Sequence, residues 1–135
     1  WTGGGGGGAG SAGNAVTIAP NSPPDADGGR GLGVSITGSL VYYAGGGGGG
    51  GNSSERGGDA YDGGGRGFGT TSYYDYLTYP VGTSPLGGSS TLHALPNTGG
   101  GGGASSYWCN NTVWGTQGSG AGGSGIVIVR YWIAQ

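Results

Sequence analysis

The sequence contains very few charged residues and only one cysteine. Charged residues make up 7% of the 135 residues, and all four basic residues are arginine, so lysine is absent. A surface that follows nucleic-acid phosphates needs many cations, and a P-loop needs a lysine. The sequence therefore predicts no nucleic-acid partner and no cofactor. Cys109 alone can neither close an intrachain disulfide nor form a thiolate metal site.

Long apolar runs are also missing. Valine, isoleucine, leucine and phenylalanine together number 19, or 14% of the chain, which is too few for an ordinary helical or α/β core. No apolar stretch approaches the roughly 20 residues of a membrane-spanning helix, so we expect no membrane insertion. No glycine-free window is both long and helically periodic, and each glycine inside a helix costs about 1 kcal/mol relative to alanine.

Glycine is the dominant residue and occupies 41 positions. Continuous runs cover residues 3–8, 45–51 and 99–103, and a looser run at 63–69 is interrupted twice. The flanks of these runs are similar, which indicates a degenerate internal repeat of unequal spacing. Collagen is excluded because the glycines follow no strict three-residue period and there are only six prolines.

Such runs form either flexible linkers or ordered polyglycine II helices. Helices without Cβ atoms can pack at near-backbone distance and hydrogen-bond to their neighbours. Order is favoured here because aromatic and β-branched residues flank the runs and a strongly apolar segment ends the chain. The predicted fold class is mostly irregular or all-β: a polyglycine II-like bundle with short β-strands and no α-helices.

We expect a single glycine-rich domain over residues 1–135. The chain opens with Trp1 in place of methionine, which predicts a processed product or the C-terminal part of a longer protein. Because the apolar surface is small, we also expect an oligomer.

Two segments have the composition of β-strands. Residues 32–43 mix β-branched and aromatic residues around Gly38, which predicts one kinked strand or two short strands. Residues 126–133 (IVIVRYWI) are the most strand-like, and their continuous apolar character predicts burial on both faces. Residues 14–30 are predicted to be a loop, and residues 70–98 a long irregular excursion.

Three stretches resemble the glycine-rich domain of tailed-bacteriophage tail fibres and related virion proteins. They are GLGVSITGSLVYYAGGGGGGG at 31–51, NTGGGGG at 97–103 and, most specifically, GGSGIVIVRY at 122–131. Members of that group begin with an apolar strand that runs into the first glycine run, whereas only two residues precede Gly3 here. The strand partner of residues 126–129 is therefore expected on a missing part of the protein or on another chain.

The resemblance implies a location on the virion surface or outside the cell. It also implies a stiff polyglycine bundle whose variable loops bind a host surface receptor, either a glycan or an outer-membrane protein. By their position between the glycine runs, the loops that the resemblance implies are residues 14–30, 52–62, 70–98 and 106–117. The predicted function is accordingly a non-enzymatic adhesin at a tail-fibre tip. The alternative is a structural subunit of an extracellular or virion fibre, which assembles with copies of itself or other fibre proteins through glycine runs and edge strands.

Exposed aromatic residues are the best candidates for ligand contact, because tyrosine and tryptophan offer a large contact area at low entropic cost. The alternative is that these rings cover the glycine bundle as a substitute core. The candidates lie in two segments of the sequence: Tyr73, Tyr74, Tyr76, Tyr79, Tyr107, Trp108 and Trp114.

The other polar residues suggest structural roles. The six acidic residues show no spacing that supports a glycosidase pair, and His93 is not accompanied by a nucleophile motif. We predict no catalytic residues and no metal site. Arg30, Arg56 and Arg66 flank glycine runs, where a guanidinium can donate to carbonyls at the end of a bundle.

Overall fold

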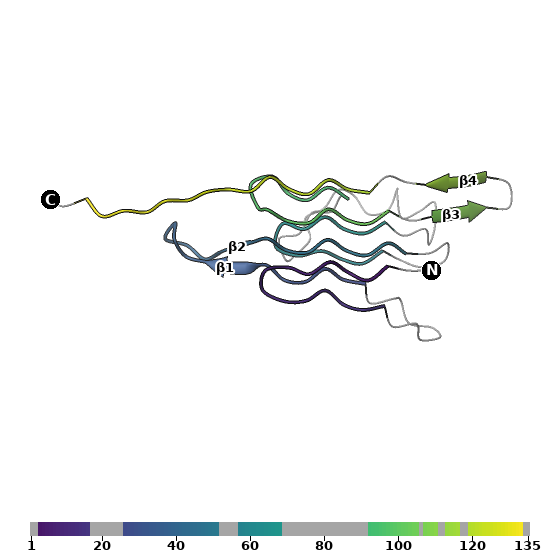
Figure 1. Ribbon diagram of the computed structural model, residues 1–135, viewed down its shortest axis with the longest axis horizontal. Coiled ribbons are helices and arrows are strands. Elements are labelled where there is room, and N and C mark those ends of the chain that lie inside the picture. Colours follow the sequence, from purple (N-terminus) through teal and green to yellow (C-terminus); the bar gives the residue numbers. More distant parts are fainter. Residues whose placement is uncertain are drawn as a thin grey trace.

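The computed structural model describes residues 3–16, 26–51, 57–68, 92–105, 107–110, 113–116 and 119–133. Extended glycine-rich segments run side by side along its long axis, with a short β-hairpin at each end of the bundle (Figure 1). None of these residues lies in an α-helix, and none belongs to a helix that could cross a membrane. The segments joined into the bundle by backbone hydrogen bonds are 3–8, 11–16, 26–31, 44–51, 57–62, 63–68, 92–95, 98–105 and 119–125.

Hydrogen bonds between neighbouring segments repeat every three residues. Every third amide of the run 45–51 donates to a carbonyl of the parallel segment 62–68, with N···O distances of 2.8–3.1 Å. Gly46 and Gly49 donate at 2.8 Å to the antiparallel segment 26–29. Three residues per turn is the period of polyglycine II. The predicted fold class is therefore confirmed, and the glycine runs pack within one chain.

The run 45–51 lies at the centre of the bundle. All of its residues are buried, and it accepts further hydrogen bonds from segments 3–9 and 101–104. A Cβ atom built on any residue from Gly45 to Gly50 would overlap a backbone carbonyl oxygen of another segment. Any side chain at these positions would force the neighbouring segments apart.

The core of the bundle is main chain. Among the described residues, the only buried hydrophobic side chains are those of Ala26 and Ala60, and no large side chain is fully buried. Close-packed interiors usually gain stability from apolar side chains. Here that contribution is small, so hydrogen bonds and backbone packing must stabilise the fold.

One hairpin lies at the end of the bundle from which the C-terminal segment emerges (Figure 1). Strand β1 (Leu32–Val34) pairs antiparallel with β2 (Val41–Tyr43), with Leu32 opposite Tyr43. Gly38 has a φ of 96° in the connecting turn and donates its N–H to the carbonyl of Ser35 at 3.0 Å. Of the two predicted forms of residues 32–43, one kinked strand or two short strands, the structure has the two short strands.

The second hairpin lies at the opposite end of the bundle (Figure 1). Strand β3 (Tyr107–Asn110) pairs antiparallel with β4 (Val113–Thr116). The register places Cys109 opposite Trp114 and Asn110 opposite Val113. The predicted loop 106–117 therefore contains a regular two-stranded ribbon.

Three of the predicted loops contribute segments to the bundle. Residues 26–30, 57–62 and 92–95 were predicted as irregular, but each one hydrogen-bonds to a neighbouring glycine segment. The loop prediction is wrong there because these segments carry glycine or alanine at most of their buried positions, as at Ala26 and Ala60, and expose larger side chains such as that of Arg30. Their mixed composition therefore does not exclude them from the bundle.

Residues 126–133 leave the bundle as an extended segment that passes beyond β1 and β2 (Figure 1). The side chain of Val127 is 90% exposed and that of Trp132 is 95% exposed. The prediction that this segment is buried on both faces is wrong for the isolated chain. No other part of the described chain lies against its outer half, so its apolar character has no intrachain explanation.

Candidate functional site

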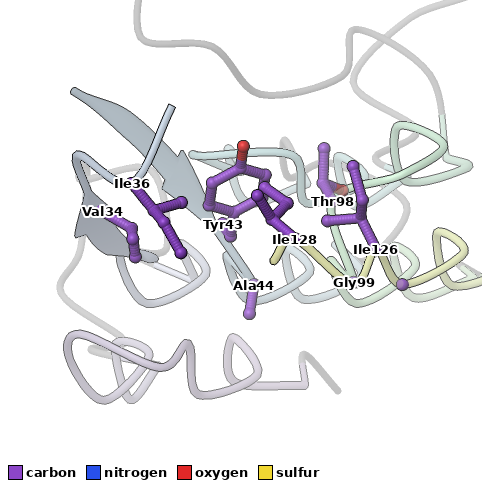
Figure 2. Close-up of a pocket in the computed structure, with 9 residues that line it drawn as sticks. Val34, Ile36, Tyr43, Ala44, Thr98, Gly99, Ile126 and Ile128 are labelled. Carbon is purple, nitrogen blue, oxygen red and sulfur yellow. The ribbon is translucent and has the colours of Figure 1, made fainter. Parts of the chain in front are cut away.

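A shallow apolar hollow lies where residues 126–133 leave the bundle. Its volume is about 390 Å³. The hairpin forms one wall and the start of the C-terminal segment forms the other, with the Tyr43 ring between them (Figure 2). The lining residues are Val34, Ile36, Tyr43, Ala44, Thr98, Gly99, Gly125, Ile126 and Ile128. This lining suits an aliphatic or aromatic side chain.

The candidate contact residues on β3 and β4 lie at the other end of the molecule. Tyr107 and Trp108 belong to β3, and Trp114 belongs to β4. The hairpin therefore brings these three sequence positions together. The tyrosine cluster (Tyr73, Tyr74, Tyr76 and Tyr79) lies outside the described residues.

A cluster of polar side chains crosslinks two neighbouring segments of the bundle. One carboxylate oxygen of Asp27 accepts the backbone N–H of Asp59 at 2.7 Å, and the other accepts the Tyr61 hydroxyl at 3.0 Å. Each oxygen therefore has a donor from segment 57–62. In the sequence Asp27 follows two prolines closely, a pattern typical of a turn; its carboxylate instead joins segment 26–31 to the next segment.

Two arginines take part in this polar cluster. The guanidinium of Arg30 lies 4.3 Å from the centre of the Tyr61 ring, in a cation–π contact. The Nε atom of Arg66 lies 3.1 Å from a carboxylate oxygen of Asp59. Both cations thus contact side chains of segment 57–62, whereas the sequence predicted contacts with carbonyls at the bundle ends. Arg56 lies outside the described residues.

Burial and charge both raise the pKa of Tyr61. Desolvation has the larger effect, followed by the hydrogen bond to Asp27 and the negative charges of Asp27 and Asp59, while Arg30 lowers the pKa. All the raising effects favour the neutral phenol, which is the form that donates to Asp27. The hydroxyl therefore remains a hydrogen-bond donor throughout the neutral pH range.

Asp62 forms a second crosslink between segments 57–62 and 26–31. Its side chain is 7% exposed, and its carboxylate accepts the buried N–H of Gly31 at 2.9 Å. The backbone of Asp62 has a φ of 51°, a left-handed conformation that aspartate and asparagine tolerate better than most residues. The residue thus combines a tight turn with a crosslink between segments.

The single histidine also has a structural contact. The Nδ1 atom of His93 accepts the backbone N–H of Ala121 at 3.0 Å, so this nitrogen is unprotonated in the arrangement shown. Within the part of the chain that the structure describes, no three histidine, cysteine or acidic residues gather as metal ligands would.

The sequence did not identify the hollow or the polar cluster. The hollow depends on where residues 126–128 leave the bundle, and no local pattern encodes that position. The cluster had a weak signal: Asp59, Tyr61 and Asp62 follow a glycine pair, and a single residue without a polar side chain, Ala60, separates Asp59 from Tyr61. Such spacing gains meaning only once the segment is known to be extended.

The sequence matches the family model described as glycine-rich domain over residues 1–132. No curated protein matches the chain significantly. No solved structure does so either. The family match supports the glycine-rich domain component of the resemblance described above.

Proposed function

Because the chain belongs to the glycine-rich domain family, we propose that it is the receptor-recognition domain of a tailed-phage fibre tip. The polyglycine bundle is the rigid support. The β3–β4 hairpin and the tyrosine cluster of the sequence bind the host surface, through either a glycan or an outer-membrane protein. The domain acts on the virion surface and has no catalytic role in this proposal.

One observation carries the proposal: the two ends of the bundle differ. The hairpin that contains Tyr107, Trp108 and Trp114 lies at one end, and residues 126–133 emerge at the other (Figure 1). An adhesin needs this polarity, because one end must contact the receptor while the other end joins the particle. Aromatic residues at the contact end fit the composition of recognition surfaces.

A rigid support favours tight recognition. Every bundle segment is tied to its neighbours by backbone hydrogen bonds, so little conformational freedom of the support remains to be lost on binding. The support then adds little to the entropic cost of association.

The structural-subunit alternative draws support from a different observation. Within residues 126–133, all the apolar residues except Ile128 are exposed, as in an assembly strand. The central glycine run 45–51 is buried within its own chain, so in this alternative assembly would use the C-terminal segment and hairpin edges and not that run.

Binding of the labelled full chain to Gram-negative cells, to their lipopolysaccharide and to their outer-membrane proteins tests the proposal. The variants Tyr107→Ala, Trp114→Ala and Tyr74→Ala/Tyr76→Ala are expected to weaken binding about tenfold or more each, as for anchor residues in other interfaces. Tyr42→Ala is the matched control, because Tyr42 is a half-exposed ring on β2 at the opposite end.

Thermal unfolding of each variant shows whether its fold is retained. Unchanged cell binding by folded Tyr107, Trp114 and Tyr74/Tyr76 variants would overturn the adhesin proposal. Loss of assembly by the same variants, with binding unchanged, would favour the structural subunit.

A further inference from the structure

The exposed segment 126–133 has apolar side chains on both of its faces. In an extended chain successive side chains point to opposite faces, so the even-numbered residues share one face and the odd-numbered residues share the other. Ile126 and Ile128 line the hollow, whereas Val127 is 90% and Val129 is 76% exposed. The even-numbered face therefore turns toward the bundle at the start of the segment.

The backbone of this segment also has open hydrogen-bonding groups. Within the described chain, no backbone hydrogen bond involves residues 126–133. The segment contains no proline, so every residue in it can donate to a neighbouring strand. An uncovered apolar strand with free edges pairs readily with another strand.

The same segment of a second copy is a poor partner. Two antiparallel strands related by a two-fold axis oppose even residues to even and odd residues to odd, because the axis keeps each side chain on its own face of the sheet. The hollow would then receive Arg130 or Trp132 of the partner subunit. An unpaired guanidinium is costly beside an apolar surface. The register that places Trp132 of the partner subunit opposite Ile128 also sets the two arginines directly opposite each other, which is destabilising.

We propose that residues 126–133 are covered by an antiparallel β-strand of a different protein, which adds to this segment through main-chain hydrogen bonds. The partner strand carries aliphatic side chains opposite Ile126 and Ile128 and an acidic side chain opposite Arg130. Strand addition takes its affinity from the main chain and its specificity from alternate side chains. The inference does not depend on the receptor that the other end of the bundle binds.

The hollow determines the apolar part of this pattern. Directly opposed residues of an antiparallel pair share a face, with Cβ atoms about 4.5–5.5 Å apart. The side chains opposite Ile126 and Ile128 therefore lie over the hollow, on the side of the Tyr43 ring (Figure 2). The hollow has a volume of about 390 Å³ and no charged lining residue, so it accepts aliphatic groups and disfavours charged ones.

The single charge of the segment determines the polar part of the pattern. Arg130 is exposed and lies two residues beyond Ile128, on the same face of the segment. Within the described chain no ion pair involves Arg130, and Arg130 does not line the hollow. Opposite charges on directly opposed residues stabilise a strand pair. An acid opposite Arg130 also fixes the register, because a slip by one residue moves the acid to the other face.

Two synthetic peptides of identical composition test the pattern, each labelled with fluorescein and titrated with the full chain. In acetyl-TETVTVT-amide, the glutamate lies opposite Arg130 and the two valines lie opposite Ile128 and Ile126. In acetyl-TVTETVT-amide, the same register places the glutamate opposite Ile128. Fluorescence anisotropy should show saturable binding of the first peptide with a dissociation constant below about 1 mM. Binding of the second peptide should be at least about tenfold weaker.

Charge reversal on the chain tests the contact with Arg130. Arg130→Glu should weaken binding of acetyl-TETVTVT-amide about fivefold, and acetyl-TKTVTVT-amide should recover most of that loss. Ile126→Asp should weaken binding of either peptide at least about tenfold, because it places a charge in the hollow. Leu40→Glu is the matched control, since Leu40 is 59% exposed between β1 and β2 and does not line the hollow; its peptide binding should be unchanged.

Absence of saturable binding up to about 1 mM, or equal affinity for the two peptides of identical composition, would overturn the inference. A dimer of the unmodified chain in sedimentation, dissociated by Val127→Asp, would also overturn it, because a second copy would then cover the segment. Loss of host-cell binding by the folded Tyr107 and Trp114 variants with peptide binding retained would leave the strand partner intact, so the two proposals fail separately.

Discussion

Replacement of Gly48 by alanine is the sharpest test of a fold whose core is main chain. The amide of Gly48 donates to the carbonyl of Gly65, and its carbonyl accepts the amide of Ala104, both at 2.9 Å. A Cβ atom on Gly48 would overlap the carbonyl oxygen of Gly58 and lie 2.7 Å from the amide nitrogen of Gly67. The methyl group therefore meets backbone on two sides.

The expected loss of stability is large for a single methyl group. Overfilling a packed core costs about 1–3 kcal/mol where side chains can rotate away. The neighbours of Gly48 are main-chain atoms held by hydrogen bonds of their own, so the upper part of that range applies. Separating the segments also weakens the two hydrogen bonds of Gly48, at about 1 kcal/mol each. The variant should lose about 3–5 kcal/mol, out of the 5–15 kcal/mol typical of a domain.

Gly7→Ala is the matched control. No atom of the described residues lies within 4 Å of a Cβ built on Gly7, so alanine fits there, and it should gain about 0.4–1 kcal/mol by restricting the unfolded chain. Both substitutions reduce the conformational entropy of the unfolded chain by the same amount. The difference between the unfolding free energies of the two variants therefore reports only packing in the bundle. Urea unfolding followed by tryptophan fluorescence measures that difference. Equal unfolding midpoints for Gly48→Ala and Gly7→Ala would refute a main-chain core.

Three further perturbations address the polar cluster and the order of the bundle. The pKa of Tyr61 is raised above 10.0, so the stability that the neutral hydroxyl contributes is fully present below pH 10 and is lost as the pH rises through the raised pKa. Tyr61→Phe should lower the free energy of unfolding by about 1 kcal/mol at neutral pH. In urea titrations, its stability should also fall less than that of the unmodified chain at alkaline pH. Asp62→Ala should lower the free energy of unfolding by about 2–4 kcal/mol, because it leaves the buried N–H of Gly31 without an acceptor and places alanine at a positive φ. Asp62→Asn should lose much less stability. Amide exchange in residues 45–51 should be slow and limited by global unfolding, and rapid exchange there would contradict an ordered bundle.

Composition predicted the architecture because glycine leaves few alternatives. A run such as 45–51 has no side chains, so it is either flexible or packed against other backbone segments. The aromatic residues that flank the run favoured packing. The strand character of residues 32–43 was also predictable, since β-branched residues surround Gly38, but the sequence left open whether they form one kinked strand or two short strands. In both cases the local sequence alone restricts the conformation.

The remaining features depend on which segments become neighbours. Asp27 looks like a turn residue after two prolines, and only the adjacent position of Tyr61 explains its carboxylate. Residues 126–133 have the composition of a buried strand, but whether they are buried depends on a partner that the sequence of one chain does not specify. Contacts between segments that are distant in the sequence cannot be predicted from the composition of either segment alone.

A main-chain core has a consequence for the evolution of binding. In an ordinary domain, loop changes are limited because loop residues often contact core side chains. Here the described core consists of backbone segments joined by hydrogen bonds, and residues in the connections need not fit into it. Segments such as 107–116 can therefore change in length and composition with little effect on the run 45–51. An adhesin that must follow changes in its receptor would gain from this separation, because its specificity could change while its support stays the same.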